Sequence, residues 1–210
     1  MKVYIVGSNG NCQYAEMYRD AGYEVVFKLE AADIVQFTGG SDVSPYLYKE
    51  FKHPTTMNNM ERDVEEAQVY NSSLATNKFM VGICRGAQFL NVMNNGGLYQ
   101  NVDNHALGGT HEAVDDKTGR VVNVTSTHHQ MMRPTSYAII LCTAALAEHK
   151  EHMIGGNIRD AFSVWEDDFE AVYYKDTKCL CFQPHPEFGV NRAGDTREYF
   201  FELLNRYVGE

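Results

Sequence analysis

Apolar and polar positions follow two kinds of pattern along this chain. Short runs of apolar and β-branched residues predict strands, and apolar residues that recur every three or four positions predict helices. In the N-terminal half the patterns predict strands at residues 2–6, 23–29, 32–37 and 78–83, and helices at 12–22, 59–76 and 85–94. This order of strands and helices predicts an α/β fold with a mostly parallel sheet that helices cover on both faces.

The pattern changes after Gly96 and Gly97. Residues 98–135 are polar and rich in asparagine, histidine and glycine, with one strand-like stretch at 120–126. The remaining predicted strands lie near residues 137–142, 160–165, 170–174 and 178–183. The chain shows no internal repeat, low-complexity tract or linker, so we expect a single domain over residues 1–210.

A final helix is predicted to begin at Asp195. Asp195 and Glu198 have the spacing of a capping box, in which each side chain accepts a hydrogen bond from the other residue's backbone. Apolar residues at helical spacing follow and form a face for the core. They are Tyr199, Phe200, Leu203, Leu204 and Tyr207.

Charge and composition narrow the classes of partner. The chain has 210 residues, 44% of them hydrophobic, which suffices for one substantial core. Its net charge of -10 disfavours nucleic acids and anionic membranes, since both would repel it. No apolar stretch is long enough to span a bilayer, and residues 1–10 lack a signal-peptide pattern. With five cysteines, an odd number, these features predict a reduced, cytoplasmic protein.

One segment carries a pattern that favours nucleophilic chemistry. In Gly82-Ile83-Cys84-Arg85-Gly86 a cysteine stands between an apolar strand and a helix, with a glycine two positions away on each side. This is the spacing of a nucleophile elbow, a strained turn where strand and helix crowd together and only small neighbours fit. The positive end of the helix also favours the thiolate. The pentapeptide alone is equally compatible with a buried structural cysteine, so a base is needed to decide.

The segment Gln183-Pro184-His185-Pro186-Glu187 supplies a candidate base. A residue before proline is held extended, and alternate residues of an extended chain face the same side. Glu187 can therefore orient the His185 imidazole and stabilise its charged form. Cys84, His185 and Glu187 then have the roles of nucleophile, base and orienting acid.

Backbone donors for an acyl-transfer oxyanion can also be identified. The Arg85 N–H directly follows the candidate nucleophile and is the natural first donor. Gly39-Gly40 stands at the carboxyl end of another predicted strand, the edge at which parallel sheets bind ligands. We therefore expect the second donor to come from this glycine pair.

Residues 82–88, Gly-Ile-Cys-Arg-Gly-Ala-Gln, and residues 183–187, Gln-Pro-His-Pro-Glu, resemble the two signature segments of the class I glutamine amidotransferase-like superfamily. Four further segments resemble its γ-glutamyl hydrolase branch, the peptidases that cleave γ-glutamyl amides. They are residues 38–48, 61–67, 91–101 and 125–130. The resemblance implies a flavodoxin-like three-layer sandwich, and a Cys84, His185 and Glu187 triad that holds the γ-glutamyl product as a thioester on Cys84.

The resemblance also implies roles that spacing alone does not identify. Gly40 and Arg85 would form the oxyanion hole, and Gln88 with the His128 region would bind the glutamyl head group. Two positions depart from the family pattern, which usually has proline at Thr38 and asparagine at Thr125. Thr38 would leave the glycine turn less rigid, and Thr125 would alter the head-group contacts.

No metal or other cofactor is predicted. His128 and His129 are adjacent, so on an extended chain they face opposite ways, and no cysteine or carboxylate ligand set stands at zinc-like spacing. Residues 7–11 lack a dinucleotide fingerprint and predict a plain turn. Cys179 and Cys181 are two positions apart on a predicted strand, so they share one face. We expect them to be core residues rather than metal ligands or redox partners. For Arg62 with Asp63, an exposed ion pair and a structural role near the active-site rim both stay open.

Three functions are compatible with these features. The first is an independent amidohydrolase that acts on γ-glutamyl amines or peptides. The second is a glutaminase subunit that passes ammonia to a separate synthetase, because no synthetase domain is found in this chain. The third, a member that binds without catalysis, is disfavoured by the intact triad. The sequence leaves open the leaving amine, the pathway, the formation of a homodimer and the role of residues 98–135.

Overall fold

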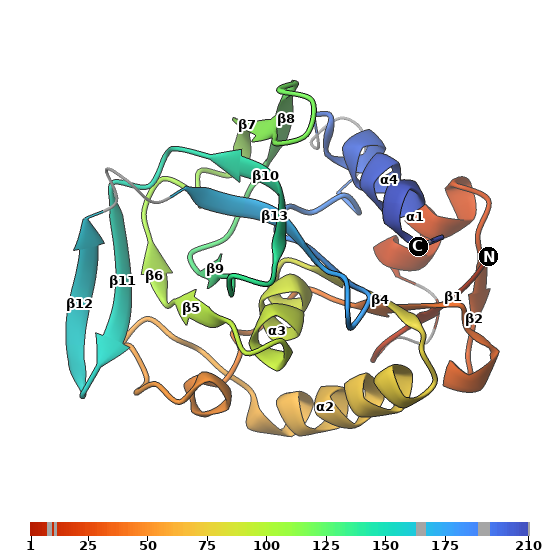
Figure 1. Ribbon diagram of the computed structural model, residues 1–210, viewed down its shortest axis with the longest axis horizontal. Coiled ribbons are helices and arrows are strands. Elements are labelled where there is room, and N and C mark those ends of the chain that lie inside the picture. The colour runs from red at the N-terminus through yellow and green to blue at the C-terminus, as the bar shows by residue number, and fades with distance from the viewer. Residues whose placement is uncertain (8–9, 11, 163–166, 189–193, 210) are drawn as a thin grey trace.

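The computed structural model describes residues 1–7, 10, 12–162, 167–188 and 194–209. Within this part of the chain the central element is a nine-stranded sheet (Figure 1). Its strands, in sheet order, are β2 (Glu24–Val26), β1 (Lys2–Ile5), β3 (Ile34–Phe37), β4 (Phe79–Ile83), β14 (Cys179–Phe182), β13 (Asp168–Tyr174), β10 (Ile139–Ala144), β7 (Gly109–Asp115) and β8 (Val121–Ser126). Strands β2 to β14 run parallel to one another, and the pairs from β14 to β8 are antiparallel.

The direction of each strand agrees with its apolar pattern. Every residue of β3, β4 and β14 is buried, as expected for parallel strands that are covered on both faces. Strand β7 instead alternates between exposed and buried positions, because one of its faces is open to solvent. The predicted α/β sandwich is therefore confirmed, with a mixed sheet in which the parallel part carries the candidate chemistry.

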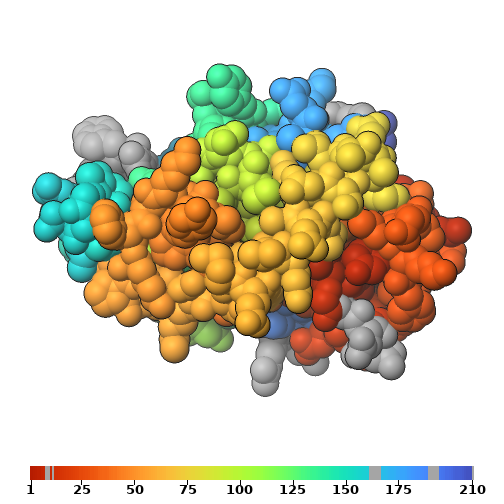
Figure 2. All heavy atoms as spheres, turned by 90° about the horizontal axis from the view of Figure 1, so that it is seen from below, coloured from red at the N-terminus to blue at the C-terminus, as the bar shows by residue number. Residues whose placement is uncertain are grey.

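Four helices form the outer layers of the described structure. Helices α1 (Gln13–Asp20) and α4 (Thr196–Tyr207) pack on one face of the sheet, and α2 (Met60–Ala75) and α3 (Arg85–Met93) pack on the other (Figure 1). The five predicted apolar residues of α4 are all buried in the core. Figure 2 shows α2 and the chain before it spread over the lower face of the molecule. Among the described residues no helix is both long enough and apolar enough to cross a membrane.

Two small sheets extend the body of the fold. Strand β6 (Asn101–Val102) pairs with β11 (His149–Ile154), which forms a hairpin with β12 (Asn157–Phe162) at one end of the molecule (Figure 1). Strand β5 (Gly97–Tyr99) pairs with β9 (Met131–Arg133) beside α3. Short 3-10 turns occur at Leu29–Ala31 and Pro45–Tyr48.

Several predicted elements are wrong in extent. The strand expected at 23–29 ends at Val26, and the segment 98–135 contains β6, β7, β9 and most of β5 besides the one strand expected there. Strands β6 and β7 carry asparagine, histidine or glycine, and they form because long-range pairing overrides weak local propensity. Strand β11 was not predicted, and β12 covers residues 157–162 where a strand was expected at 160–165. Residues 163–165 of that prediction, and residues 8, 9 and 11 of the predicted turn, lie outside the described residues.

The predicted capping box at α4 is also wrong. Asp195 stands at the N-cap, but its side chain makes no capping hydrogen bond. Its Oδ2 instead accepts the backbone N–H of Asn123 at 2.9 Å, and its own N–H donates to the Asn123 carbonyl at 2.9 Å. Asp195 therefore joins the start of α4 to the edge strand β8.

The strand order places one crevice at the carboxyl ends of the parallel strands. The chain moves from β1 to β2 on one side, and then returns to β3 on the other side of β1. Crevices at such a reversal of strand order are where open α/β sheets bind ligands. Gly39, Cys84 and His185 follow β3, β4 and β14 respectively, so all three lie at this edge.

Gly86 allows α3 to approach the sheet closely, and its replacement should destabilise the fold. A Cβ at Gly86 would collide with the backbone carbonyl of Phe37 at the end of β3. We expect Gly86→Ala to lower the free energy of unfolding by about 1–3 kcal/mol. Urea unfolding followed by circular dichroism measures this change. Gly109→Ala, where an added Cβ meets open space, is the matched control. A Gly86→Ala protein more stable than wild type, as helix propensity alone would give, would contradict the expected collision.

Candidate active site

Cys84 lies at a sharp turn between β4 and α3. Its backbone has φ 50° and ψ -112°, outside the regions that a residue with a side chain ordinarily adopts. The Cys84 N–H donates to the Phe182 carbonyl at 2.9 Å, and its carbonyl accepts the Gln88 N–H at 3.0 Å. A Cβ at Gly82 would collide with the Gly86 carbonyl, so glycine is required where strand and helix cross. The turn has the geometry expected of a nucleophile elbow.

His185 and Glu187 lie in the segment that follows β14. The His185 Nδ1 is 2.6 Å from the Glu187 Oε1, and the imidazole stacks on Phe188 with ring centroids 4.5 Å apart. The backbone N–H of His185 donates to the Thr125 Oγ1 at 2.7 Å. Thr125 thus contacts the backbone of the candidate base from β8. This contact gives a structural role to one of the two positions that depart from the family pattern.

Three separate segments converge at Gly39. A Cβ at Gly39 would lie 2.9 Å from the His185 Cε1 and 3.7 Å from the Cys84 Cβ. Burial alone would lower the pKa of His185, but hydrogen bonds with Cys84 and Glu187 raise it to about 10. A raised imidazole pKa favours a charged pair of His185 with the thiolate. The structure therefore brings Cys84, His185 and Glu187 together although 101 residues separate Cys84 from His185.

Tyr14 lies in α1, and the sequence did not identify it as a site residue. Its hydroxyl accepts the Gly39 N–H at 2.9 Å, so it fixes the turn beside the thiol. Burial and the nearby Glu187 charge raise the pKa of Tyr14, which keeps the phenol protonated. Because tyrosine is common on the buried face of a helix, the sequence gives no signal for this contact.

A buried ion-pair network supports the elbow from behind. The Arg85 guanidinium is 1% exposed and pairs with Asp63 and Glu66 of α2. Burial, together with the neighbouring charge of Arg62, lowers the pKa of Arg85 to about 10. Asp63 also accepts the backbone N–H of Ser44 at 3.0 Å. Asp63 is therefore a buried partner of Arg85, and the exposed Arg62–Asp63 pair that the sequence left open is wrong.

Arg62 connects this network to the glycine pair. Its Nε donates to Glu66 at 2.8 Å, its Nη1 to the Gly39 carbonyl at 3.0 Å, and its Nη2 to the Thr38 carbonyl at 2.9 Å. The Thr38 hydroxyl accepts a further bond from the Arg62 Nη2 at 3.1 Å. Gly40, with φ +133°, has no room for a side chain because Arg62 occupies that space. Arg62 thus restrains the segment in which threonine replaces the usual proline.

A hollow of about 210 Å³ opens in front of Cys84. Residues from α3, the turn after β3 and the chain after β8 line it. They are Gly40, Ser41, Asp42, Met57, Cys84, Arg85, Gln88, Thr127, His128, His129 and Gln130. All four residues predicted for the oxyanion hole and the head group, namely Gly40, Arg85, Gln88 and His128, therefore line this hollow.

Gln88 and His128 differ in what they offer to a ligand. The Gln88 Nε2 donates to the Gln130 carbonyl at 2.9 Å and to the Gln183 Oε1 at 3.2 Å, which uses both amide hydrogens. Its Oε1 is then the group left to accept from a ligand. The His128 Nδ1 lies 3.0 Å from the Gln130 carbonyl, and its Nε2 lies 3.7 Å from the buried Glu170. Both ring nitrogens of His128 thus lie against protein groups.

Asp42 and His129 are lining residues that the sequence did not identify as part of the site. The His129 Nε2 lies 3.1 Å from the Asp42 Oδ1, and this contact raises the pKa of His129. Asp42 also accepts the backbone N–H of Met57 through its Oδ2 at 2.7 Å. The run Gly-Gly-Ser-Asp after β3 could have indicated Asp42, since it places a carboxylate directly behind the glycine pair.

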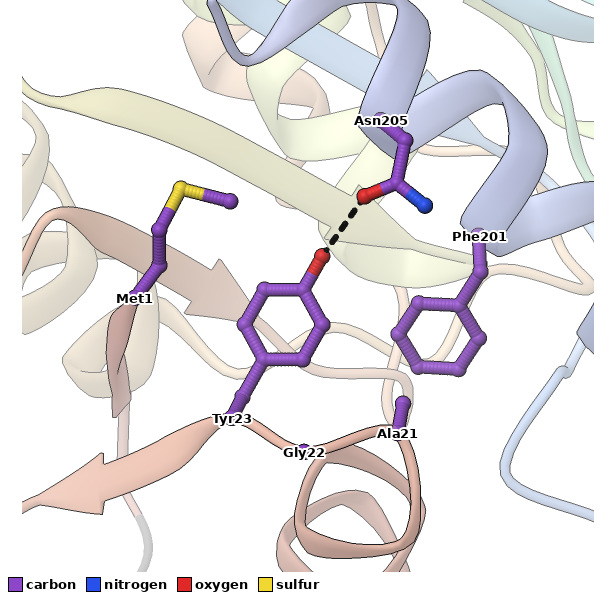
Figure 3. A pocket seen from close by; sticks show the side chains of 6 residues that line it. All are labelled: Met1, Ala21, Gly22, Tyr23, Phe201 and Asn205. Atoms are coloured by element: carbon purple, nitrogen blue, oxygen red, sulfur yellow. Dashed lines mark hydrogen bonds between the residues drawn. The ribbon is translucent and has the colours of Figure 1, made fainter.

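A second hollow lies away from Cys84, between the end of α1 and α4 (Figure 3). Its volume is about 320 Å³, and the Tyr23 hydroxyl donates across it to the Asn205 Oδ1 at 3.0 Å. The described residues that line it include no cysteine, histidine or carboxylate. The smaller hollow at Cys84 is therefore the candidate active site.

Related proteins share the sequence of this region. Residues 23–187 match the sequence model of the peptidase C26 family. The glutamine amidotransferase-like protein YvdE of Lactococcus lactis subsp. lactis is 29% identical over 192 residues, covering 83% of this chain and 78% of YvdE. Protein NtpR of Enterococcus hirae is 40% identical over 75 residues, and this alignment covers 35% of the present chain and 31% of NtpR.

Solved structures share the fold at low sequence identity. A protein from Thermoplasma acidophilum that is described as part of a GMP synthase superposes with a TM-score of 0.64 at 14% identity, covering 100% of this chain and 92% of that chain. A glutamine amidotransferase from Thermotoga maritima superposes with a TM-score of 0.60 at 16% identity, covering 98% of this chain and 82% of the other. These similarities establish a glutamine amidotransferase-like, flavodoxin-like fold.

The raised pKa of His185 can be measured directly. In ¹⁵N-histidine-labelled protein we expect the His185 ring signals to titrate with a midpoint near pH 10, the imidazolium being present below it and lost above it. Cys84→Ala and Glu187→Gln should each lower this midpoint, because each removes a hydrogen-bonding partner of the ring. The other histidine signals serve as internal controls. A wild-type midpoint at the ordinary value of about 6.5 would contradict the charged pair.

Proposed function

We propose, since the chain belongs to the peptidase C26 family, that it is a cysteine-dependent hydrolase of γ-glutamyl amide bonds. One observation carries the proposal: the His185 ring interacts with Cys84 and with Glu187 at the same time, beside an open hollow. A thiol beside such a base can act as a nucleophile. The family supports an amide hydrolase in general, and the γ-glutamyl specificity is our inference from the residues of the hollow.

In the proposed mechanism the resting site holds the charged pair of thiolate and imidazolium, so the proton of the Cys84 thiol already lies on His185 before the attack. The Cys84 sulfur attacks the γ-carbonyl carbon and forms a tetrahedral intermediate. His185 then donates its proton to the leaving amine as the C–N bond breaks, and a γ-glutamyl thioester remains on Cys84. Water, deprotonated by His185, attacks this thioester and releases glutamate, while Glu187 stays ionised and holds the ring.

The proposed oxyanion hole uses backbone N–H groups of Arg85 and Gly40. The Arg85 N–H lies in the first turn of α3, where helix N–H groups have no carbonyl partner within the helix. Its side chain is committed to Asp63 and Glu66, so its backbone is what it contributes to the hollow. Gly40 lines the same hollow from the turn that Arg62 restrains. Two such donors stabilise the oxyanion of a tetrahedral intermediate.

The α-amino group of a γ-glutamyl substrate is the part that the hollow suits best. The Gln88 Oε1 can accept from an ammonium, and Asp42 adds a negative charge nearby. An ammonium held at this end would leave the γ-carbonyl directed toward Cys84. This arrangement favours γ-glutamyl amides over ordinary peptide bonds, which lack the free α-amino group beyond the scissile carbonyl.

The first test measures glutamate release by the purified chain alone. Glutamine and a panel of γ-glutamyl amines and γ-glutamyl peptides are the substrates. We expect turnover of at least one γ-glutamyl amine or peptide, with glutamine a poorer substrate. Cys84→Ala should reduce kcat by at least about 10³-fold, since it removes the nucleophile. Activity that survives in Cys84→Ala would exclude the thioester mechanism.

A second function, a glutaminase subunit, is favoured by one surface feature. Tyr46, Phe51 and Met57 are largely exposed on the segment that leads to α2, and Met57 also lines the hollow. This segment lies on the face that Figure 2 shows. Exposed apolar groups at the rim of a site suit a protein partner, such as a synthetase that receives ammonia. A chain inactive on the whole panel, yet labelled at Cys84 by a glutamine-like electrophile, would support this function instead.

Arg62 is proposed as a positioning residue for the oxyanion hole. Arg62→Lys keeps a positive charge beside Glu66 but loses the planar fork that holds the carbonyls of Thr38 and Gly39. We expect kcat to fall about 10- to 100-fold with KM little changed. The displaced Gly40 N–H would stabilise the oxyanion less well, and the oxyanion develops only after the substrate has bound. Thr38→Val, which removes only the hydroxyl contact, is the control and should have a smaller effect. A wild-type kcat in Arg62→Lys would refute this role.

A further inference from the structure

Three histidines and a glutamate from separate segments meet behind the wall of the candidate active site. His105 follows β6, His111 lies in β7, His128 follows β8 and Glu170 lies in β13. Their exposed fractions are 0%, 7%, 3% and 0%. We call these four residues the histidine cluster. The proposed hydrolytic mechanism uses none of them.

The ring nitrogens of the cluster converge on one carboxylate oxygen. The distances to the Glu170 Oε1 are 3.0 Å from the His111 Nε2, 3.3 Å from the His105 Nδ1 and 3.7 Å from the His128 Nε2. The ring centroids of His105 lie 4.9 Å from His111 and 4.7 Å from His128. One ligand atom from each of His105, His111 and Glu170 therefore lies within 4.8 Å of the others, and the His128 Nε2 approaches the same carboxylate oxygen from the side.

The other ring nitrogens of two histidines are fixed as donors. The His105 Nε2 lies 2.9 Å from the Asp168 Oδ2, which also accepts two backbone N–H groups, and so it faces an acceptor. The His128 Nδ1 faces the Gln130 carbonyl at 3.0 Å. In a neutral imidazole the remaining nitrogen then carries a lone pair. The lone pair of His128 is thus directed at the cluster interior. Against the effect of burial, Asp168 and Glu170 raise the pKa of His105 to about 9, so a metal ion would displace the proton from its Nδ1. The outer N–H of each ring is held by a carboxylate or carbonyl, as is typical of histidines that bind a metal.

Hydrogen bonding accounts for this cluster less well than a cation does. The His111 Nε2 is at hydrogen-bonding distance from the Glu170 Oε1 and can donate to it, but the His105 Nδ1 and the His128 Nε2 face the same oxygen. The Glu170 Oε2, the His105 Nδ1 and the His128 Nε2 are buried without a hydrogen-bond partner among the described residues. Donors around a carboxylate would be expected to use both of its oxygens. A cation at the point of convergence satisfies the lone pairs and the carboxylate together.

The spacing of the ligand atoms indicates which cation. Zinc binds imidazole nitrogen and carboxylate oxygen at about 2.0–2.2 Å in tetrahedral geometry, which places ligand atoms about 3.3–3.5 Å from one another. The three distances to the Glu170 Oε1 fall on both sides of this value. His105, His111 and Glu170 supply three of the four positions, and the His128 Nε2, 3.7 Å from the Glu170 Oε1, is the nearest group to take the fourth when the ion is bound.

We propose that the histidine cluster is a structural zinc site. The ion would join three segments, those that carry His105, His111 and His128, to β13. Because His128 also lines the hollow at Cys84, the ion would fix one wall of the candidate active site from behind. This proposal replaces the sequence-based expectation that the chain binds no metal. It does not depend on which γ-glutamyl compound, if any, the chain hydrolyses.

The test measures zinc binding in the Cys84→Ala background, so that no ion can bind through the Cys84 thiol. The protein is stripped with a chelator, reloaded with Zn²⁺, desalted and analysed by mass spectrometry for metal content. We expect about one zinc per chain and a higher melting temperature after reloading, as binding to the folded state requires. Reloading with Co²⁺ should give the visible absorption bands of a tetrahedral site.

Two variants separate this site from other histidines. His111→Gln removes a ligand near the surface and should weaken zinc binding by at least roughly tenfold. His149→Gln alters the exposed group of Asp103, Glu148 and His149 and should leave zinc content unchanged. A folded Cys84→Ala protein that retains no zinc after reloading overturns the proposal, and this result requires no variant of the cluster. The proposal is also overturned if His149→Gln loses zinc while a folded His111→Gln protein keeps it.

Discussion

The buried charge of Arg85 is the constraint on which the candidate active site depends. A guanidinium removed from water is stable only with close, well-placed counter-charges. Both of these come from α2, through Asp63 and Glu66, so α2 is fixed against the first turn of α3. Glu66 in turn holds Arg62, and Arg62 holds the carbonyls at the end of β3. The position of the glycine turn therefore follows from the need to neutralise one side chain.

The same residue serves the fold and the site through different groups. The Arg85 side chain reaches away from the hollow into the space between α2 and α3, where it also packs over the Phe89 ring at 5.1 Å. Its backbone N–H remains at the start of the helix, beside Cys84. A strained turn such as that at Cys84 persists only when its surroundings over-determine it. The paired charges of Arg85, together with the close crossing of β4 and α3 at Gly82 and Gly86, hold the turn at Cys84 in its strained conformation.

The sequence predicted the parallel half of the fold well, because local patterns coincide with tertiary structure there. Continuous apolar runs become the central strands. The two glycines around Cys84 are needed because β4 and α3 cross closely there, and both elements lie within a few residues of the cysteine. His185 and Glu187 were accessible for the same reason, since the prolines restrain them locally. Tyr14 and Asp42 were not identified as site residues, because their contacts with Gly39 and His129 depend on chain segments far away in sequence.

The segment 98–135 shows the opposite case. Apart from β8, its strands have weak local propensity, and they form by pairing with one another and with residues beyond position 139. The members of the histidine cluster are spread from His105 to Glu170, so no spacing rule for metal ligands could have grouped them. Histidines in this polar stretch have the appearance of solvated loop residues until the sheet is assembled. Chemistry that depends on such assembly can be recognised only from the structure.

The hydrogen bond from the His185 backbone to Thr125 makes the candidate base sensitive to strand register. Thr125 lies on β8, the last strand of the sheet, and its neighbours along the strand point to the opposite face. A slip of one residue between β7 and β8 would turn its hydroxyl away from His185. The start of α4 guards against this slip, because Asp195 and Thr196 bond to the free edge of β8 at Asn123 and Thr125. Accurate pairing of an edge strand is thus a condition for a correctly placed imidazole, and a folding error at β8 would lower the reactivity of a thiol that follows β4, in the middle of the sheet.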